Sequence, residues 1–120
     1  MTIQPKRVLV ADDETLITML LTDMLGDLGS EVVGPANTYE EAISLASSSD
    51  FDWAILDLNM DGLSTIPVAK ILRDRGIPFV IASGAAPENH HGVLAGVGWL
   101  QKPFEFAAVA RVFSAALPAS

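Results

Sequence analysis

Short runs of hydrophobic residues recur along the chain, separated by longer segments in which apolar and polar positions follow a helical period. The runs occupy residues 8–11, 32–34, 53–56, 79–82 and, more weakly, 98–100. The first, third and fourth runs are continuously apolar, which is typical of parallel strands buried on both faces of a sheet. The pattern therefore predicts a parallel sheet of five strands.

Helical periodicity marks the segments that connect these strands, at residues 14–28, 39–46, 64–75 and 105–117. In the first, apolar residues from Ile17 to Leu28 recur at steps of three and four, and Gly29 stands at the position of a helix C-cap. Thr38 is placed to cap the second helix, with Glu41 three residues later as its capping-box partner. These segments are predicted to be helices.

The segment before the fifth strand has a different composition. Residues 84–98 contain Pro87 and four glycines, and each glycine inside a helix costs about 1 kcal/mol relative to alanine. We expect at most a short or frayed helix near residues 88–94, so the fourth helix should be irregular. The whole pattern is (βα)5, an α/β fold with a doubly wound parallel sheet and helices on both faces in three layers.

Length and composition narrow the class of protein. The chain has 120 residues, of which 50% are hydrophobic, which suits one domain spanning residues 1–120. A net charge of -8 argues against nucleic-acid binding and against a polybasic membrane anchor. The absence of cysteine excludes disulfides, thiolate zinc sites and a cysteine nucleophile. With neither a signal peptide nor a transmembrane run, we expect a soluble, cytoplasmic protein without a membrane partner.

Polar residues follow the predicted strands directly. Asp12 and Asp13 come after the first strand, Asp57 after the third, Ser83 after the fourth and Lys102 after the fifth. Ligands of open parallel sheets bind beyond the carboxyl ends of the strands, so these side chains should share one rim. Two like charges about 5 Å apart repel by roughly 3 kcal/mol at an effective dielectric of 20. Magnesium, a hard cation with oxygen ligands, would offset that repulsion.

Each acidic residue also has a simpler structural interpretation. Asp12 and Asp13 could be the N-cap and acidic first turn of a helix that continues with Glu14. Asp57 could be a turn residue at the end of a strand. The combination of an aspartate after an apolar strand, an acidic pair, a lysine and a hydroxyl on one rim has few such explanations.

This ordered set resembles the receiver domain of response regulators in two-component signalling, over essentially the whole chain. The motifs that carry the resemblance are Asp12-Asp13-Glu14, residues 56–62 (LDLNMDG), Ser83-Gly84 and Lys102-Pro103-Phe104. The resemblance implies the flavodoxin-like strand order 2-1-3-4-5. It also implies that Asp57 is the phosphoacceptor and that Mg2+ is held by Asp12, Asp13, Asp57 and the backbone carbonyl of Asn59.

The resemblance assigns roles to three further residues. Ser83 takes the place of the switch hydroxyl, Lys102 that of the phosphate-binding lysine, and Trp99 that of an aromatic switch residue. Lys102–Pro103 is the candidate cis peptide, because receivers usually carry one at this step. An aspartate carboxylate is a competent nucleophile toward a phosphoryl group, and catalysis then consists of positioning and charge neutralisation.

The implied function is that of a stand-alone receiver that accepts a phosphoryl group from a sensor histidine kinase or a histidine phosphotransfer protein. It would signal by protein–protein contact or act as a phosphate shuttle or sink, with no separate substrate turnover. Residues 77–84 are similar to a receiver subgroup with a P-F-x-F-A-T-G-Y signature, whose members often work with HWE/HisKA2 kinases. Ile81, Ser83 and Ala85 depart from that signature.

Other classes of protein are weighed against this one. A phosphatase with an aspartyl-phosphate intermediate usually needs an acid two residues after the nucleophile, where this chain has Asn59. A flavodoxin would need a phosphate-binding loop after the first strand, where the acidic residues repel phosphate. A pseudo-receiver would keep the fold without phosphorylation.

The first helix is the expected docking surface for the phosphodonor. Its outward positions, Thr15, Thr18, Met19 and Thr22, carry little charge. In receivers the phosphotransfer partner docks beside the site on this helix, so Leu16 and Met19 are candidate contacts.

Overall fold

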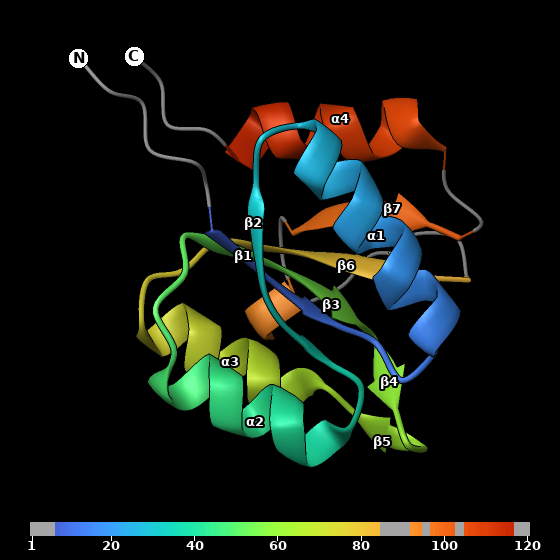
Figure 1. The fold of residues 1–120 in the computed structure, drawn as a ribbon. Helices are drawn as coiled ribbons and strands as arrows, with labels where there is room; N and C mark the ends of the chain where they lie inside the picture. The colour runs from blue at the N-terminus through green and yellow to red at the C-terminus, as the bar shows by residue number, and fades with distance from the viewer. Residues whose placement is uncertain (1–6, 85–91, 95–96, 103–104, 117–120) are drawn as a thin grey trace.

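A parallel sheet forms the centre of the molecule in the computed structural model, which describes residues 7–84, 92–94, 97–102 and 105–116 (Figure 1). The sheet consists of β1 (Arg7–Ala11), β2 (Glu31–Ala36), β3 (Trp53–Asp57), β6 (Phe79–Ser83) and β7 (Gly98–Gln101). The spatial order is β2-β1-β3-β6-β7, all parallel. This confirms the flavodoxin-like α/β fold, with β6 and β7 as the fourth and fifth predicted strands.

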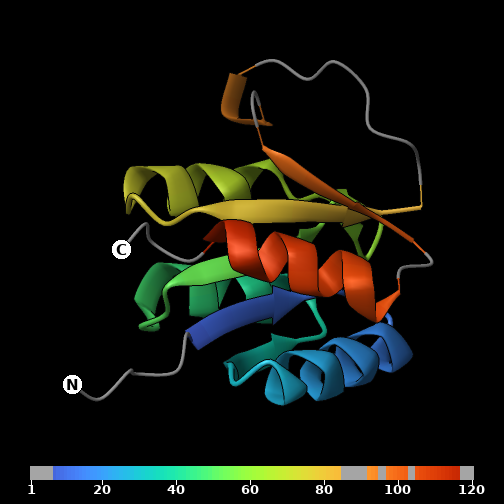
Figure 2. The same cartoon turned by 90° about the horizontal axis from the view of Figure 1, so that it is seen from above.

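Helices cover both faces of the sheet. α1 (Thr15–Asp27) and α4 (Phe106–Ala116) lie on one face, and α2 (Tyr39–Ser48) and α3 (Ile66–Asp74) lie on the other (Figure 1). Figure 2 shows the arrows of β1, β6 and β7 pointing toward the same end of the molecule. Among the described residues, no helix is long and apolar enough to cross a membrane.

Alternate residues of the apolar strands pack into two hydrophobic cores, one on each face of the sheet. Along β1, Leu9 and Ala11 pack toward α2 and α3, while Val8 and Val10 pack toward α1 and α4. All four are at most 1% exposed, as expected of a strand covered on both sides. This burial fixes the register of β1, because a slip of one residue would exchange its two faces.

The predicted helix boundaries rest on capping interactions that the structure contains. Gly29 has φ +86, its N–H donates to Gly26 O at 3.0 Å, and Ser30 N–H donates to Leu25 O at 2.8 Å. These are the two bonds of a Schellman motif, which ends α1. Glu41 N–H donates to Thr38 Oγ1 at 3.1 Å, which confirms Thr38 as the N-cap of α2.

The third helix begins later than the sequence pattern predicts. Instead of starting at residue 64, it starts at Ile66, and the preceding residues form a hairpin of β4 (Asn59–Met60) and β5 (Leu63–Ser64). Asp61 and Gly62 at its tip have φ +53 and +75. Two consecutive residues with positive φ define the two-residue turn that Asp-Gly favours, so the helical interpretation overlooked a hairpin signal.

Two predictions fall partly on residues outside the described ranges. Of the irregular fourth helix, the structure describes a single 3-10 turn, η1 (Gly92–Leu94). The proline of the predicted cis step Lys102–Pro103 lies outside the described residues, so the structure does not test that prediction. A cis peptide within the described residues joins Gly34 and Pro35.

Candidate functional site at the carboxyl ends of the strands

Three carboxylates converge where β1 and β3 end. One oxygen each from Asp12, Asp13 and Asp57 lies within 4.8 Å of the other two. Asp12 is 1% exposed and Asp57 is 9% exposed, whereas Asp13 faces solvent. Such burial of like charges is costly unless cations or hydrogen bonds compensate it, so this cluster is the strongest candidate site in the described part of the chain.

The helix-cap interpretation of the acidic pair is wrong. α1 begins at Thr15 with Glu14 as its N-cap residue, and no side chain caps it. Asp12 instead folds back locally, and its Oδ1 accepts the N–H of Glu14 at 2.9 Å. This bond turns the chain after β1, so that Asp12 stays buried in the rim while Asp13 lies at the surface.

One lysine provides positive charge to the cluster. Lys102 Nζ lies 2.6 Å from Asp12 Oδ2, 3.7 Å from Asp57 Oδ2 and 3.9 Å from Glu14 Oε1. The Lys102 pKa is raised because the hydrogen bond and charge of Asp12, with the charge of Asp57, outweigh the opposing effect of burial. A single ammonium facing several carboxylates leaves the rim with an excess of negative charge.

The Asp57 carboxyl titrates far from its ordinary range. Burial, and then the charge of Asp12, raise its pKa from 3.8 to about 6, although Lys102 and a hydrogen bond from the Asn59 N–H oppose the shift. At neutral pH the group is therefore ionised but held in an unfavourable environment. A carboxylate in this state is poised for reaction with, or coordination to, an electrophilic centre.

The structure places the hydroxyl and the lysine predicted from sequence on the same rim. Ser83 ends β6, is 8% exposed and pairs in register with Gln101. The Lys102 N–H donates to Ser83 O at 2.7 Å. This hydrogen bond holds the backbone of Lys102 beside that of Ser83. Trp99 lies deeper in β7, opposite Ile81, half-buried against the core on the α2 and α3 side.

Backbone anchors that the sequence analysis did not identify hold the acidic residues. The Thr65 hydroxyl, 1% exposed, lies 2.6 Å from Asp57 O and 2.9 Å from Leu58 O. The residue therefore ties the start of α3 to the end of β3. A buried threonine just before a helix resembles an N-cap in sequence, and only the fold shows that its hydroxyl points back to Asp57.

A second anchor joins α1 to the loop after β2. Asn37 Nδ2 donates to Asp12 O at 3.1 Å and to Thr18 Oγ1 at 2.9 Å. Thr18 was predicted to face outward, but it is 1% exposed, because the amide of Asn37 satisfies its hydroxyl inside the protein. A polar residue in a helix is normally predicted to face solvent. It can be buried instead when a specific hydrogen-bond partner is available inside the protein.

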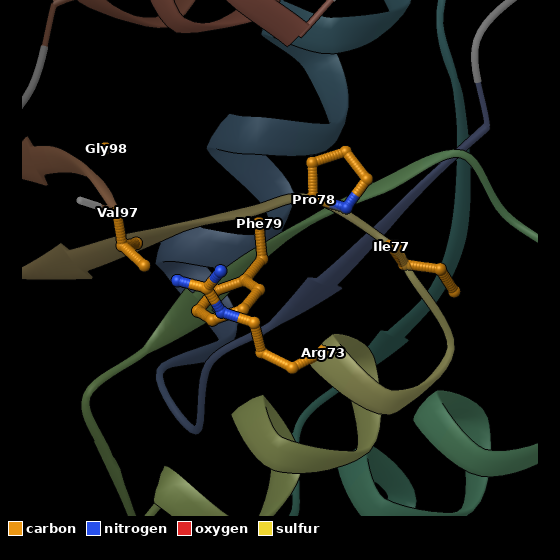
Figure 3. Close-up of a pocket in the computed structure, with 6 residues that line it drawn as sticks. All are labelled: Arg73, Ile77, Pro78, Phe79, Val97 and Gly98. Atoms are coloured by element: carbon orange, nitrogen blue, oxygen red, sulfur yellow. The ribbon is translucent and has the colours of Figure 1, made fainter. Parts of the chain in front are cut away.

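A pocket lies at the opposite end of the sheet (Figure 3). The residues that line it are Arg73, Ile77, Pro78, Phe79, Val97 and Gly98. They come from the end of α3 and the beginnings of β6 and β7, and none is a carboxylate. The acidic rim therefore carries the candidate chemistry, away from this pocket.

A five-stranded parallel sheet in the order β2-β1-β3-β6-β7, with acidic residues, a hydroxyl and a lysine at its carboxyl rim, is the arrangement expected of the receiver domains of response regulators. The chain belongs to that class: the family model described as the response regulator receiver domain matches residues 8–113.

Individual relatives agree with this assignment. The transcriptional regulatory protein PdtaR of Mycobacterium tuberculosis is 40% identical over 78 residues, which cover 64% of this chain and 38% of PdtaR. The solution structure of SdrG from Sphingomonas melonis Fr1 is 35% identical with a TM-score of 0.82, covering 98% of this chain and 100% of SdrG. The BeF3-activated conformation of SdrG from Pseudomonas melonis Fr1 is 38% identical, with a TM-score of 0.78 over 93% of this chain and 96% of that one.

Proposed function

We propose that this protein receives a phosphoryl group on Asp57 from a sensor histidine kinase or a histidine phosphotransfer protein. The observation that carries the proposal is the convergence of three carboxylate oxygens within 4.8 Å, with Lys102 Nζ 3.7 Å from Asp57 Oδ2. The family and the buried position of Asp57 at the end of β3 support the same assignment.

The donor set at the rim fits Mg2+. Carboxylate and carbonyl oxygens are the ligands this ion prefers, and Asp12, Asp13, Asp57 and the backbone carbonyl of Asn59 would hold it. The excess negative charge around Lys102 also calls for a further cation. When bound, Mg2+ would neutralise charge on the phosphoryl oxygens.

The chemical step is a phosphoryl transfer between two side chains. An oxygen of the ionised Asp57 carboxylate forms a bond to phosphorus while the phosphorus–nitrogen bond of the donor phosphohistidine breaks. The electron pair of that bond remains on the imidazole nitrogen, and the product on this chain is an acyl phosphate. The Lys102 ammonium stands where it can pair with the incoming phosphoryl oxygens.

Ser83 is the part of the proposal that converts modification into a signal. Its hydroxyl would donate to a phosphoryl oxygen that exists only after transfer, so it would distinguish two states of the protein. Trp99 on the neighbouring β7 would respond to that change as the aromatic switch. The output would then be a protein–protein contact, or the domain would act as a phosphate shuttle or sink.

Helix α1 would receive the phosphodonor. Leu16, Met19 and Leu20 are 79%, 59% and 40% exposed, on the helix that begins directly after the acidic pair. Exposed apolar side chains beside a reactive group are a natural contact surface. The similarity of residues 77–84 to the P-F-x-F-A-T-G-Y subgroup supports a donor kinase of the HWE/HisKA2 type.

The domain would turn over no separate substrate, which distinguishes it from an aspartyl-phosphate phosphatase. Such an enzyme usually has an acid two residues after the nucleophile, and this chain has Asn59 there. Steady release of phosphate from phosphomonoesters would support the phosphatase. A single unit over residues 1–120 and a cytoplasmic location belong to the same proposal.

Incubation with Mg2+ and a small phosphodonor, followed by intact mass measurement, tests the assignment. We expect one phosphate adduct on the wild-type protein and none on Asp57→Asn. An adduct on both proteins would remove Asp57 from its role, and an adduct that forms equally well in excess chelator would remove Mg2+ from the proposal.

A further inference from the structure

The tip of the hairpin between β3 and α3 contacts Asp13, the exposed member of the acidic cluster, through Asp61. Asp61, at the tip of the β4–β5 hairpin, donates its backbone N–H to Asp13 Oδ2 at 2.9 Å. Its own Oδ2 accepts the N–H of Tyr39, the first residue of α2, at 2.9 Å. A single residue therefore links a proposed metal ligand to the beginning of a helix that is distant in sequence.

The carboxylate of Asp61 is well suited to its contact with α2. The first N–H groups of a helix lack partners within the helix, and the helix dipole favours a negative charge there. Thr38 satisfies the N–H of Glu41, and Asp61 satisfies the N–H of Tyr39. The two residues thus serve different donors at the same helix end.

The backbone of Asp61 adopts a conformation that needs support. Among the described residues, Asp61 is the one non-glycine residue with positive φ, at +53. Aspartate adopts this left-handed conformation more readily than most side chains, but the conformation remains uncommon and persists where surrounding interactions hold it. The bond from Tyr39 provides that support, and it aims the Asp61 N–H at Asp13.

Asp13 depends on this contact more than its neighbours depend on theirs. Asp12 is held by burial, by Lys102 and by the Glu14 N–H, whereas Asp13 is exposed. An exposed side chain samples several rotamers, and fixing one before an ion binds lowers the entropy cost of binding.

We infer that Asp61 is a positioning residue, which orients Asp13 for the cation by holding the hairpin tip against α2. The inference rests on the proposed function, since it assigns Asp13 to Mg2+. By thermodynamic reciprocity, a cation that prefers the oriented Asp13 also stabilises the contact between the hairpin and α2.

Calorimetric titration with Mg2+ tests this on the wild type and three variants. We expect Asp61→Gly, which removes the side-chain bond and keeps the left-handed turn, to weaken Mg2+ binding roughly tenfold. Asp61→Asn loses the same charge but keeps an oxygen for the Tyr39 N–H, so it should bind Mg2+ within about threefold of wild type. The difference between the two variants separates orientation from charge.

Thr38→Ala is the matched control, because it removes another hydrogen bond from the same end of α2. It should leave Mg2+ affinity within about twofold of wild type. Hydrogen exchange gives an independent readout: Mg2+ should slow exchange of the Tyr39 amide in the wild type and have no such effect in Asp61→Gly.

The outcomes separate the two proposals. A wild type that binds no Mg2+ overturns the proposed function, whatever the variants do. If the wild type binds Mg2+ and Asp61→Gly binds equally well, the metal site stands and the role of Asp61 is overturned. Equal losses in Asp61→Gly and Thr38→Ala also overturn it, because general loosening of α2 then explains the effect.

Discussion

Charged side chains have different surroundings at the two ends of the parallel sheet. At the amino end, arginines lie against aromatic rings, with Arg73 5.7 Å from the centre of Phe79 and Arg75 5.3 Å from that of Phe51. At the carboxyl end, Asp12 and Asp57 are buried together and share Lys102. Between the two ends, the middle residues of β3 (54–56) and of β6 (81–82) are apolar and at most 1% exposed.

The difference favours a structural role for the amino end and a chemical role for the carboxyl end. Arg75 also donates to Ser49 O at 2.8 Å, just past the end of α2, so that its charge meets helix carbonyls as well as a ring. The carboxyl end instead raises the Asp57 pKa to about 6 through burial and the charge of Asp12. A pKa shifted in this way by burial and a neighbouring like charge is typical of functional sites.

The largest expected effect is at the carboxyl end. Asp57→Asn should abolish phosphorylation, because an amide is not a nucleophile toward phosphorus at neutral pH. Intact mass after incubation with a small phosphodonor and Mg2+ measures it. Asp50→Asn, an exposed residue near the amino end, should be phosphorylated like the wild type. Equal loss of phosphorylation in Asp57→Asn and Asp50→Asn would contradict the proposed difference between the two ends.

Removal of the lysine should slow the reaction without abolishing it. Lys102→Ala removes the ammonium 3.7 Å from Asp57 Oδ2, and loss of one stabilising group in a phosphoryl-transfer site costs on the order of 100-fold in rate. The rate of adduct formation measured against time checks this. A rate within twofold of wild type would show that Lys102 only balances the charge of Asp12.

A substitution at the amino end should lower the stability of the protein and leave its phosphorylation rate nearly unchanged. Phe79→Ala removes a buried ring that Arg73 covers, and should lower the free energy of unfolding by about 3 kcal/mol. Denaturant unfolding measures that loss. At low temperature, where the variant stays folded, its phosphorylation rate should remain within about twofold of wild type, and a hundredfold loss would contradict the division between the ends.

The smallest effect concerns pH. The folded-state pKa of Asp57 is raised to about 6, so ionised Asp57 opposes folding above that pH, and the folded protein binds a proton before the unfolded chain as pH falls. Without Mg2+, Asp57→Asn should be more stable than wild type by about 1–3 kcal/mol at pH 8, and the gap should close between pH 6 and 4.

Unfolding across this pH range checks the sign. Asp50→Asn is again the control, since its exposed carboxylate should contribute no comparable pH-dependent difference. A gap that widened as the pH fell would mean that Asp57 is stabilised, and not strained, by its surroundings.

The sequence predicted the parts of the molecule that depend on local pattern. Continuous apolar runs gave the strands, Gly29 and Thr38 gave helix ends, and strand ends gave the acidic rim. It missed the hairpin around Asp61 because the predicted third helix began at residue 64, inside β5, and no strand was predicted on either side of the Asp-Gly turn. Local periodicity cannot show such contacts between distant segments as the one from Asn37 to Thr18.

The bond from the Lys102 N–H to Ser83 O has a mechanical consequence. It couples the residue that would pair with the phosphoryl group to the residue that would report its presence, at the ends of neighbouring strands. A displacement at the end of β6 would therefore be transmitted to the end of β7, and the reverse. A partner that binds either strand end would therefore also influence the position of the other.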